Sequence, residues 1–141
     1  MRIWHKDLIP VLPRQQLLGQ WRECCAIAKS IAEKGTPNHV LVNRVMEYPP
    51  NHFYWYSNLV CEEMIHRGYK LNADRYTRFV CSFDSVSKYY QCKTKNEDIF
   101  KDWHNDRYLR QCLYNLQEKF DAGAIPKDEW QQFTDRFPEY K

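Results

Sequence analysis

The strongest constraint on the fold is an apolar stripe that recurs at spacings of three and four residues between Arg14 and Lys34. Such spacing places the apolar side chains on one face of an α-helix, which advances about 100° per residue. Gly35-Thr36-Pro37 follows, with Gly35 suited to a left-handed cap. The pattern predicts a helix from Arg14 to about Lys34, with a core face of Leu17, Trp21, Cys24, Ala28 and Ile31.

Two further stripes predict long helices later in the chain. One follows the break at Pro49-Pro50, runs from Asn51 to Arg67 and stops at Gly68. The other covers about Asn105 to Ala122, with Asn105 or Asp106 as its cap and Gly123 at its end. The core faces are Phe53, Tyr56, Val60 and Met64 in the first, and Leu109, Cys112, Leu113, Leu116 and Phe120 in the second.

The remaining segments predict less regular structure. Prolines make residues 1–13 an irregular arm, and residues 38–48 fit a short helix or a buried turn. Residues 72–102 predict one or two short helices, with Lys93–Asp98 as an exposed loop, and Pro126 opens a short last helix. Only 4 of 141 residues are Gly, as expected for helices joined by short loops. We predict a mainly α fold: a single compact domain, residues 1–141, of three main helices plus short helices and an irregular N-terminal arm.

Composition argues against several classes of protein. Apolar residues make up 43% of the chain and charged residues 28%, which is typical of a globular domain. No run approaches the roughly 18 apolar residues of a membrane span, and the first seven residues lack the apolar centre of a signal peptide. We therefore expect a cytoplasmic protein without a membrane partner. The six cysteines form no Cys-x-x-Cys pair, so we expect free, mostly buried thiols and no metal site.

The positive charge lies in the first third of the chain. Residues 1–45 hold seven basic and three acidic side chains, whereas residues 46–141 hold fourteen and fifteen. A basic region of this kind fits an anionic partner such as a phosphate backbone, although a solvated, slightly basic surface explains it as well. Ten Tyr and five Trp would suit a surface on which bases stack.

Glu23 is the candidate for chemistry within this basic third. On a helix it lies within about 40° of Gly19 and about 20° of Gln16, but about 160° from Trp21 on the core face. It therefore faces outward, next to Arg22, and Gly19 leaves room on the same face for a ligand. The alternative is an ordinary exposed Glu beside an ordinary exposed Arg.

The start of the chain resembles a known family. Met1-Arg2-Ile3, followed by Gln15-x-Leu17-x-x-x-Trp21-Arg22-Glu23, is similar to the pyrimidine-dimer DNA glycosylases, the phage endonuclease V family. Mature members begin Thr-Arg-Ile and carry a comparable Gln-x-Leu…Tyr-Arg-Glu segment. Weaker similarity continues in residues 52–70 and 104–119, and the opening also resembles bacterial relatives that begin Met-Arg-(Leu/Ile)-Trp-His.

The resemblance implies a DNA glycosylase with abasic-site lyase activity that cuts double-stranded DNA, needs no metal or cofactor and acts as a monomer. Members use the N-terminal α-amine, whose reference pKa of about 7.7 to 8 leaves roughly a tenth of it neutral at pH 7. That amine attacks C1′ of the damaged nucleotide, expels the base and leaves an imine, from which β-elimination cuts the strand. The implied catalytic residues are Met1 and Glu23, and the expected DNA-binding residues are Arg2, Gln15, Arg22 and Lys29.

The chain departs from the family pattern at three positions. Met1 stands where the family has its nucleophilic Thr, and the bulk of Arg2 predicts that the initiator Met1 is retained. Gln16 replaces a family His, and Ala26 replaces a family Arg, which predicts weaker phosphate binding. Two alternatives therefore stay open: a non-catalytic nucleic-acid-binding module on the same fold, and an enzyme that acts on another nucleic-acid substrate.

Three other features have both a functional and a structural interpretation. The run His52–Tyr56 fits either base stacking or a helix core. His104-Asn105-Asp106 fits a polar cluster near the site or a helix cap. The aromatic tail after Pro126 fits a family-like tail or simple packing of the C-terminus.

Overall fold

The computed structural model describes residues 2–34, 39–84 and 92–140. In these ranges every regular element is a helix, which confirms the mainly α fold class. In chain order the elements are η1 (Lys6–Val11), α1 (Arg14–Lys34), α2 (Val40–Met46), α3 (Pro50–His66), α4 (Ala73–Cys81), α5 (Asp106–Asp121), α6 (Lys127–Arg136) and η2 (Pro138–Tyr140).

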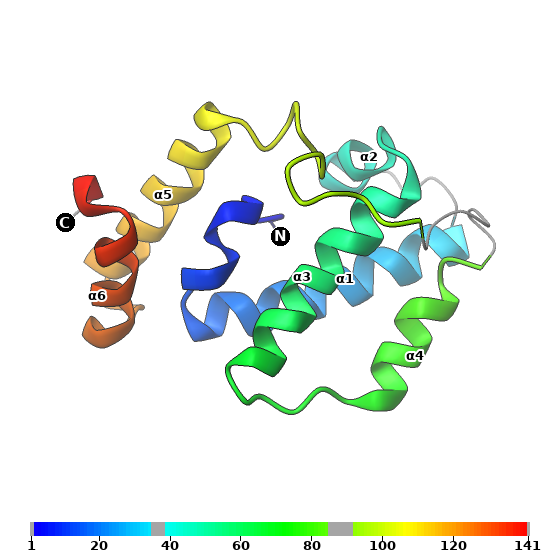
Figure 1. Cartoon of the computed structure of the whole chain (residues 1–141), viewed down its shortest axis with the longest axis horizontal. Coiled ribbons are helices and arrows are strands. Elements are labelled where there is room, and N and C mark those ends of the chain that lie inside the picture. The colour runs from blue at the N-terminus through cyan, green and yellow to red at the C-terminus, as the bar shows by residue number, and fades with distance from the viewer. Residues whose placement is uncertain (1, 35–38, 85–91, 141) are drawn as a thin grey trace.

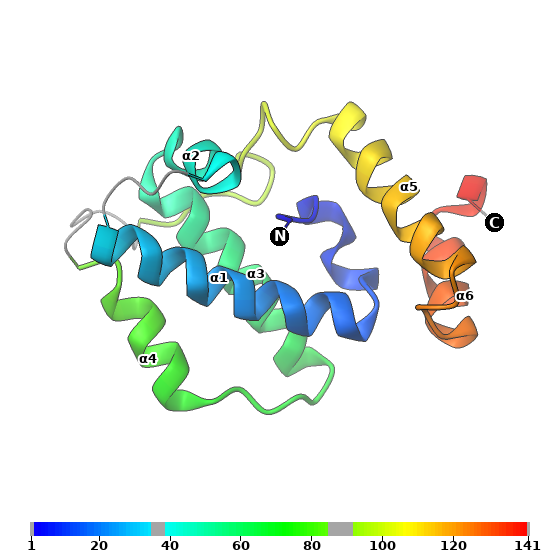
Figure 2. The same cartoon turned by 180° about the vertical axis from the view of Figure 1, so that it is seen from behind.

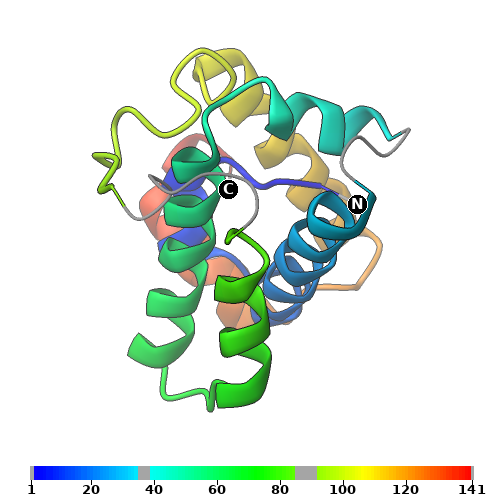
Figure 3. The same ribbon diagram turned by 90° about the vertical axis from the view of Figure 1, so that its right-hand side faces the viewer.

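The helices form two groups with the N-terminal arm between them (Figure 1). Helices α1 and α3 pack together, and α4 packs on α1. Seen from behind, α1 lies in front of α3, while α5 and α6 stand at the other end of the molecule (Figure 2). The side view shows α4 between α3 and α1 in its lower half (Figure 3). The arm contacts both groups, because η1 packs on α3 and on α6.

The three long helices begin and end within one residue of the predicted bounds. On α1 the predicted core residues are buried, apart from Ile31, which is partly buried and packs against the core. Gly68 and Gly123 end α3 and α5 with φ values of 82° and 83°, a left-handed conformation that favours glycine. The cap predicted at Gly35 lies outside the described residues.

The shorter segments are more ordered than their sequences indicated. Residues 6–11 of the arm form a 3₁₀-helix despite Pro10, because such a short turn needs few backbone donors. Arg67, just after α3, fixes the end of this turn by donating to the carbonyl oxygen of Leu12 at 2.8 Å. Of the residues that fit a short helix or a buried turn, Val40–Met46 form helix α2. Helix α4 is a short helix within residues 72–102, as predicted.

The predicted loop Lys93–Asp98 is exposed except at one position. Thr94 is buried, since its hydroxyl accepts a hydrogen bond from Asn51 of α3. The expectation of a wholly exposed loop is therefore wrong at this residue, because a single polar contact ties the loop to α3.

The aromatic clusters have structural roles. Phe53, Tyr54 and Tyr56 of α3 are buried in the core, and the C-terminal Trp130, Phe133 and Tyr140 are buried as well. Among the described residues, no helix combines the length and the apolar character needed to cross a bilayer.

Candidate active site

Glu23 of α1 holds the start of the chain. The backbone nitrogen of Arg2 donates a hydrogen bond to Glu23 Oε2 at 3.2 Å. Glu23 is only half-buried, and its other oxygen makes no hydrogen bond with any residue that the structure describes. One carboxylate oxygen thus anchors the arm while the other stays available. Met1, the expected nucleophile, lies outside the described residues.

Gln20, one turn before Glu23, fixes the arm through two backbone bonds. Its Nε2 donates to the carbonyl oxygen of Arg2 at 2.9 Å, and its Oε1 accepts from the backbone nitrogen of Trp4 at 2.8 Å. The same Nε2 lies 3.4 Å from Glu23 Oε2. Gln20 is 1% exposed, so this buried amide is fully used in orienting the arm and the carboxylate.

Two tyrosines from other helices complete the attachment. Tyr56 of α3 donates its hydroxyl proton to the carbonyl oxygen of Trp4 at 2.6 Å and lies 3.0 Å from Gln20 Oε1. Tyr108 of α5 donates to the carbonyl oxygen of Ile3. Burial raises the pKa of both hydroxyls, so both remain protonated donors. Three helices therefore hold residues 2–4 in one position.

A buried pair of histidines secures the next part of the arm. His5 Nε2 donates to the carbonyl oxygen of His104 at 2.9 Å, and His104 Nδ1 accepts from the backbone nitrogen of Lys6 at 3.0 Å. The proton of a neutral His104 is therefore assigned to Nε2, which is buried without a partner among the described residues. Burial, reinforced by His5 and Lys6, lowers the pKa of His104 to about 2, so its ring is uncharged at neutral pH.

Glu23 lines a hollow of about 350 Å³ between α1 and α5. Arg2 and Lys119 bring two positive charges to it, and the guanidinium of Arg2 stacks over Trp4 with 5.3 Å to the ring centroid. Gln16 Oε1 is buried there without a hydrogen bond to a described residue. The lining residues are Arg2, Trp4, Gln15, Gln16, Gly19, Gln20, Glu23, Asn115 and Lys119.

A second hollow, of about 700 Å³, lies on the other side of Arg2. Trp103 and Tyr108 give it an aromatic wall, and Arg44 adds a further cation, paired with Glu47 at 2.7 Å. Arg2 lines both hollows, so its guanidinium stands between the carboxylate site and an aromatic recess.

The structure gathers only some of the predicted site residues. Arg2, Gln15 and Glu23 line one hollow, whereas Arg22 and Lys29 line another, between α1 and α4. Adjacent helix positions diverge by about 100°, which separates Arg22 from Glu23. Arg22 still reaches the rim of the first hollow, since its Nη2 lies 3.7 Å from the position of a Cβ on Gly19. Arg22 is exposed, as the alternative of an ordinary surface pair expects, whereas Glu23 is half-buried and accepts a hydrogen bond from the backbone nitrogen of Arg2.

Three residues that hold the arm, Gln20, Tyr56 and Tyr108, were not predicted as site residues, whereas His104 belongs to a segment for which a polar cluster near the site was one interpretation. A signal existed for Gln20, a polar residue three after Leu17 and four before Cys24 on the core stripe. Tyr56 lies on the predicted core face of α3, and a buried Tyr usually has a hydrogen-bond partner, which is the signal that its hydroxyl would bond to another part of the chain. Asn105 does cap α5, by accepting from the backbone nitrogen of Tyr108 at 2.9 Å, while His104 belongs to the polar cluster.

The cysteines and possible metal ligands give no separate site. All six cysteines are free; Cys24, Cys61 and Cys112 are buried, and Cys81 and Cys92 are exposed. Within the described ranges, no three His, Cys, Asp or Glu side chains gather as metal ligands would.

Comparison with known proteins identifies the family to which this chain belongs. The family described as pyrimidine dimer DNA glycosylase matches residues 1–77, more than half of the chain. The matched segment contains the arm, α1 to α3 and the start of α4, and with them Arg2, Gln20, Glu23 and Tyr56. No significant match was found among curated proteins or among solved structures. The chain belongs to the pyrimidine dimer DNA glycosylase family, whose members act in DNA repair.

Proposed function

We propose that this protein is a DNA glycosylase with abasic-site lyase activity on double-stranded DNA, in which the α-amine of Met1 is the nucleophile. The bond between the backbone nitrogen of Arg2 and Glu23 Oε2, 3.2 Å long, carries the proposal. An α-amine on residue 1 is separated from this nitrogen by only two backbone carbons. Covalent geometry therefore keeps such an amine within reach of the half-buried carboxylate.

The amine replaces the base on the sugar. Its nitrogen bonds to C1′ as the bond from C1′ to the base breaks, and the base leaves with a proton. Loss of the amine proton and opening of the C1′–O4′ bond then give an imine, with O4′ taking up a proton. In this proposal Glu23 accepts and returns these protons, and its negative charge stabilises the cationic iminium.

Strand cleavage follows from the same imine. The imine acidifies the C2′ proton, a base removes it, and the electron pair expels the 3′ phosphate oxygen as the C3′–O bond breaks. We assign phosphate binding to Arg2, and its position in the lining of both hollows supports this role. The recess lined by Trp103 and Tyr108 has a volume of about 700 Å³ and an aromatic wall on which an extrahelical base could stack, which supports base flipping.

Borohydride trapping tests this proposal. Untagged protein, with its Met1 amine verified by intact mass and terminal sequencing, is incubated with a duplex that carries one abasic site and is then reduced. We expect a covalent protein–DNA adduct that maps to Met1. The matched control carries a Gly-Ser extension before Met1, and we expect it to give no adduct and no cleavage.

Three outcomes contradict the proposal. An adduct on a lysine would assign the nucleophile to a side chain, and full activity of the extended protein would exclude the terminal amine. If a verified free terminus gives no adduct although the protein binds DNA, the chain is a non-catalytic binding module on the family's fold.

A further inference from the structure

A third hollow, of about 640 Å³, lies between α1 and α4 and is lined by charged residues. Arg22 and Lys29 contribute positive charges from α1, and Arg75 and Arg78 contribute them from α4. Glu33 is the single carboxylate that lines it, and the floor contains Cys25, Ala26 and Phe79. We call this hollow the α1–α4 groove.

The four cations of the α1–α4 groove are exposed, and none of them pairs with a carboxylate of the described residues. The ion pairs in those ranges join Arg44 to Glu47 and Arg67 to Glu63. Glu33 lines the same hollow but forms no ion pair with the four cations in the part of the chain that the structure describes. Four cations and one carboxylate leave the groove with an excess of positive charge, and an anionic partner would relieve the repulsion among the cations.

The spacing of these charges fits an elongated polyanion. Arg22 and Lys29 are two turns apart on α1, about 10 Å along its axis. Arg75 and Arg78 are one turn apart on α4, which packs against α1 and forms the opposite wall. Positive charge thus follows both walls of the groove, as a sugar–phosphate backbone requires, rather than converging on one point.

Arg22 lies between the α1–α4 groove and the candidate active site. The Nη2 atom of Arg22 lies 3.7 Å from the position of a Cβ on Gly19, and Gly19 lines the hollow that contains Glu23. A DNA strand that leaves Glu23 past Gly19 therefore meets Arg22 and then the groove.

We propose that the α1–α4 groove binds the phosphate backbone of duplex DNA on one side of the lesion, with Arg75 and Arg78 as contacts. The proposal rests on the proposed function for its substrate, and it adds a binding surface on α4. The contacts are to phosphates, so they add affinity and fix the orientation of the duplex without reading its sequence.

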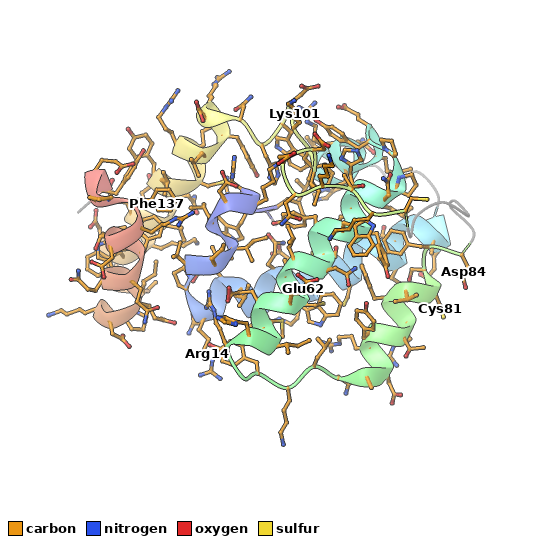
Figure 4. All side chains as sticks on the ribbon, viewed as in Figure 1. Arg14, Glu62, Cys81, Asp84, Lys101 and Phe137 are labelled. Atoms are coloured by element: carbon orange, nitrogen blue, oxygen red, sulfur yellow. The ribbon has the colours of Figure 1, made fainter. Side chains whose placement is uncertain are left out.

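The salt dependence of DNA binding tests the groove. Arg75→Gln/Arg78→Gln is compared with Lys127→Gln/Arg136→Gln, which removes the same charge from exposed positions on α6. Cys81 at the end of α4 and Phe137 just after α6 mark opposite ends of the molecule (Figure 4). Binding is measured by fluorescence anisotropy from 50 to 200 mM salt, with a duplex that carries an abasic analogue lacking the C1′ oxygen, so that no chemistry occurs.

We expect the groove variant to lose about 1.8 from the slope of log K against log salt, since each phosphate contact contributes about 0.9. At 0.1 M salt its affinity should fall by about 10-fold or more. The α6 variant should keep the parental slope. Arg75→Lys/Arg78→Lys should restore most of the slope, which a folding defect would not allow, and shortening the duplex on one side of the analogue should reproduce the loss.

Three results would overturn the proposal: an unchanged slope in the groove variant, an equal loss in the α6 variant, or no effect of shortening either side of the duplex. Unchanged DNA binding with lost binding to poly-glutamate would assign the groove to an acidic protein instead. The measurement is independent of catalysis. If the salt slope changes in the Arg75/Arg78 variant but borohydride traps no adduct, only the proposed chemistry is refuted. If borohydride traps the adduct but the salt slope does not change in this variant, only the proposed role of the groove is refuted.

Discussion

The hollow around Glu23 and the α1–α4 groove differ in how firmly their polar side chains are fixed. Around Glu23, Gln20 and Tyr56 are buried and hydrogen-bonded, and they fix residues 2–4. In the α1–α4 groove, Arg75 and Arg78 are exposed and pair with no described carboxylate. A preorganised site suits a reaction that needs groups in fixed positions, whereas mobile surface cations suit binding to a backbone of any sequence. The comparison predicts that substitutions on the first side change rates and stability, and those on the second change salt-dependent affinity.

The largest expected effect is that of Glu23→Gln on the rate. The amide keeps the size of the side chain and an oxygen that can accept from the Arg2 nitrogen, but it cannot take up a proton. We expect abasic-site cleavage to fall by about 10²- to 10⁴-fold, measured in single-turnover gels, with DNA affinity and its salt slope near the parental values.

Glu62→Gln is the matched control, because Glu62 is exposed on the face of α3 turned toward the viewer in Figure 4, in front of α1. Its cleavage rate should equal that of the parent. Parental cleavage by Glu23→Gln would show that another group handles the protons.

The next effect is a loss of stability in acid through His104. The folded protein holds the pKa of this ring at about 2, far below the ordinary value near 6.5. Below pH 6.5 the unfolded chain therefore binds a proton that the folded one does not. The free energy of unfolding should fall by about 1.4 kcal/mol per pH unit from this group, roughly 3 kcal/mol between pH 6 and pH 4.

Urea titrations across this pH range measure the slope. His104→Gln does not titrate, so its stability should depend less steeply on pH, and His66→Gln, at an exposed position, is the control for loss of a histidine. Equal slopes for all three proteins would mean that His104 is charged in the folded state.

A smaller effect is expected for Tyr56→Phe. Loss of the hydroxyl removes the donor to the Trp4 carbonyl oxygen and leaves that buried acceptor without this partner. We expect a loss of about 1 to 2 kcal/mol in the free energy of unfolding, together with slower cleavage, because the arm is held less firmly. Tyr48→Phe is the control, since the hydroxyl of Tyr48 bonds to no described residue; a similar loss there would contradict a specific role of Tyr56.

The smallest effect belongs to Ala26→Arg in the α1–α4 groove. Ala26 is exposed between Arg22 and Lys29, so an arginine there adds a fifth cation to the proposed backbone track. We expect several-fold tighter DNA binding and a salt slope larger by about 0.9, with no change in the rate at saturating protein. Ala124→Arg, in the exposed turn after α5, adds the same charge elsewhere. An equal gain in DNA affinity there would show that the gain comes from net charge and not from the groove.

The three long helices, the family motif and the position of Glu23 off the core face of α1 could all be predicted from residue spacing alone. These features depend on neighbours three and four residues apart, or on a glycine at a left-handed position, so a linear pattern records them. The short segments were less predictable, because η1 and the burial of Thr94 depend on contacts from α3.

Packing between distant helices sets how the arm is held and which charges share a surface. Tyr56 donates to Trp4 across 52 positions of the chain and Tyr108 donates to Ile3 across 105, and such partners have no signature in local spacing. Arg22 and Glu23 are neighbours in sequence, yet they line hollows on different sides of α1 because the helix turns about 100° per residue. The linear sequence indicates which groups the chain possesses, and packing between distant helices determines which of them can act on the same substrate.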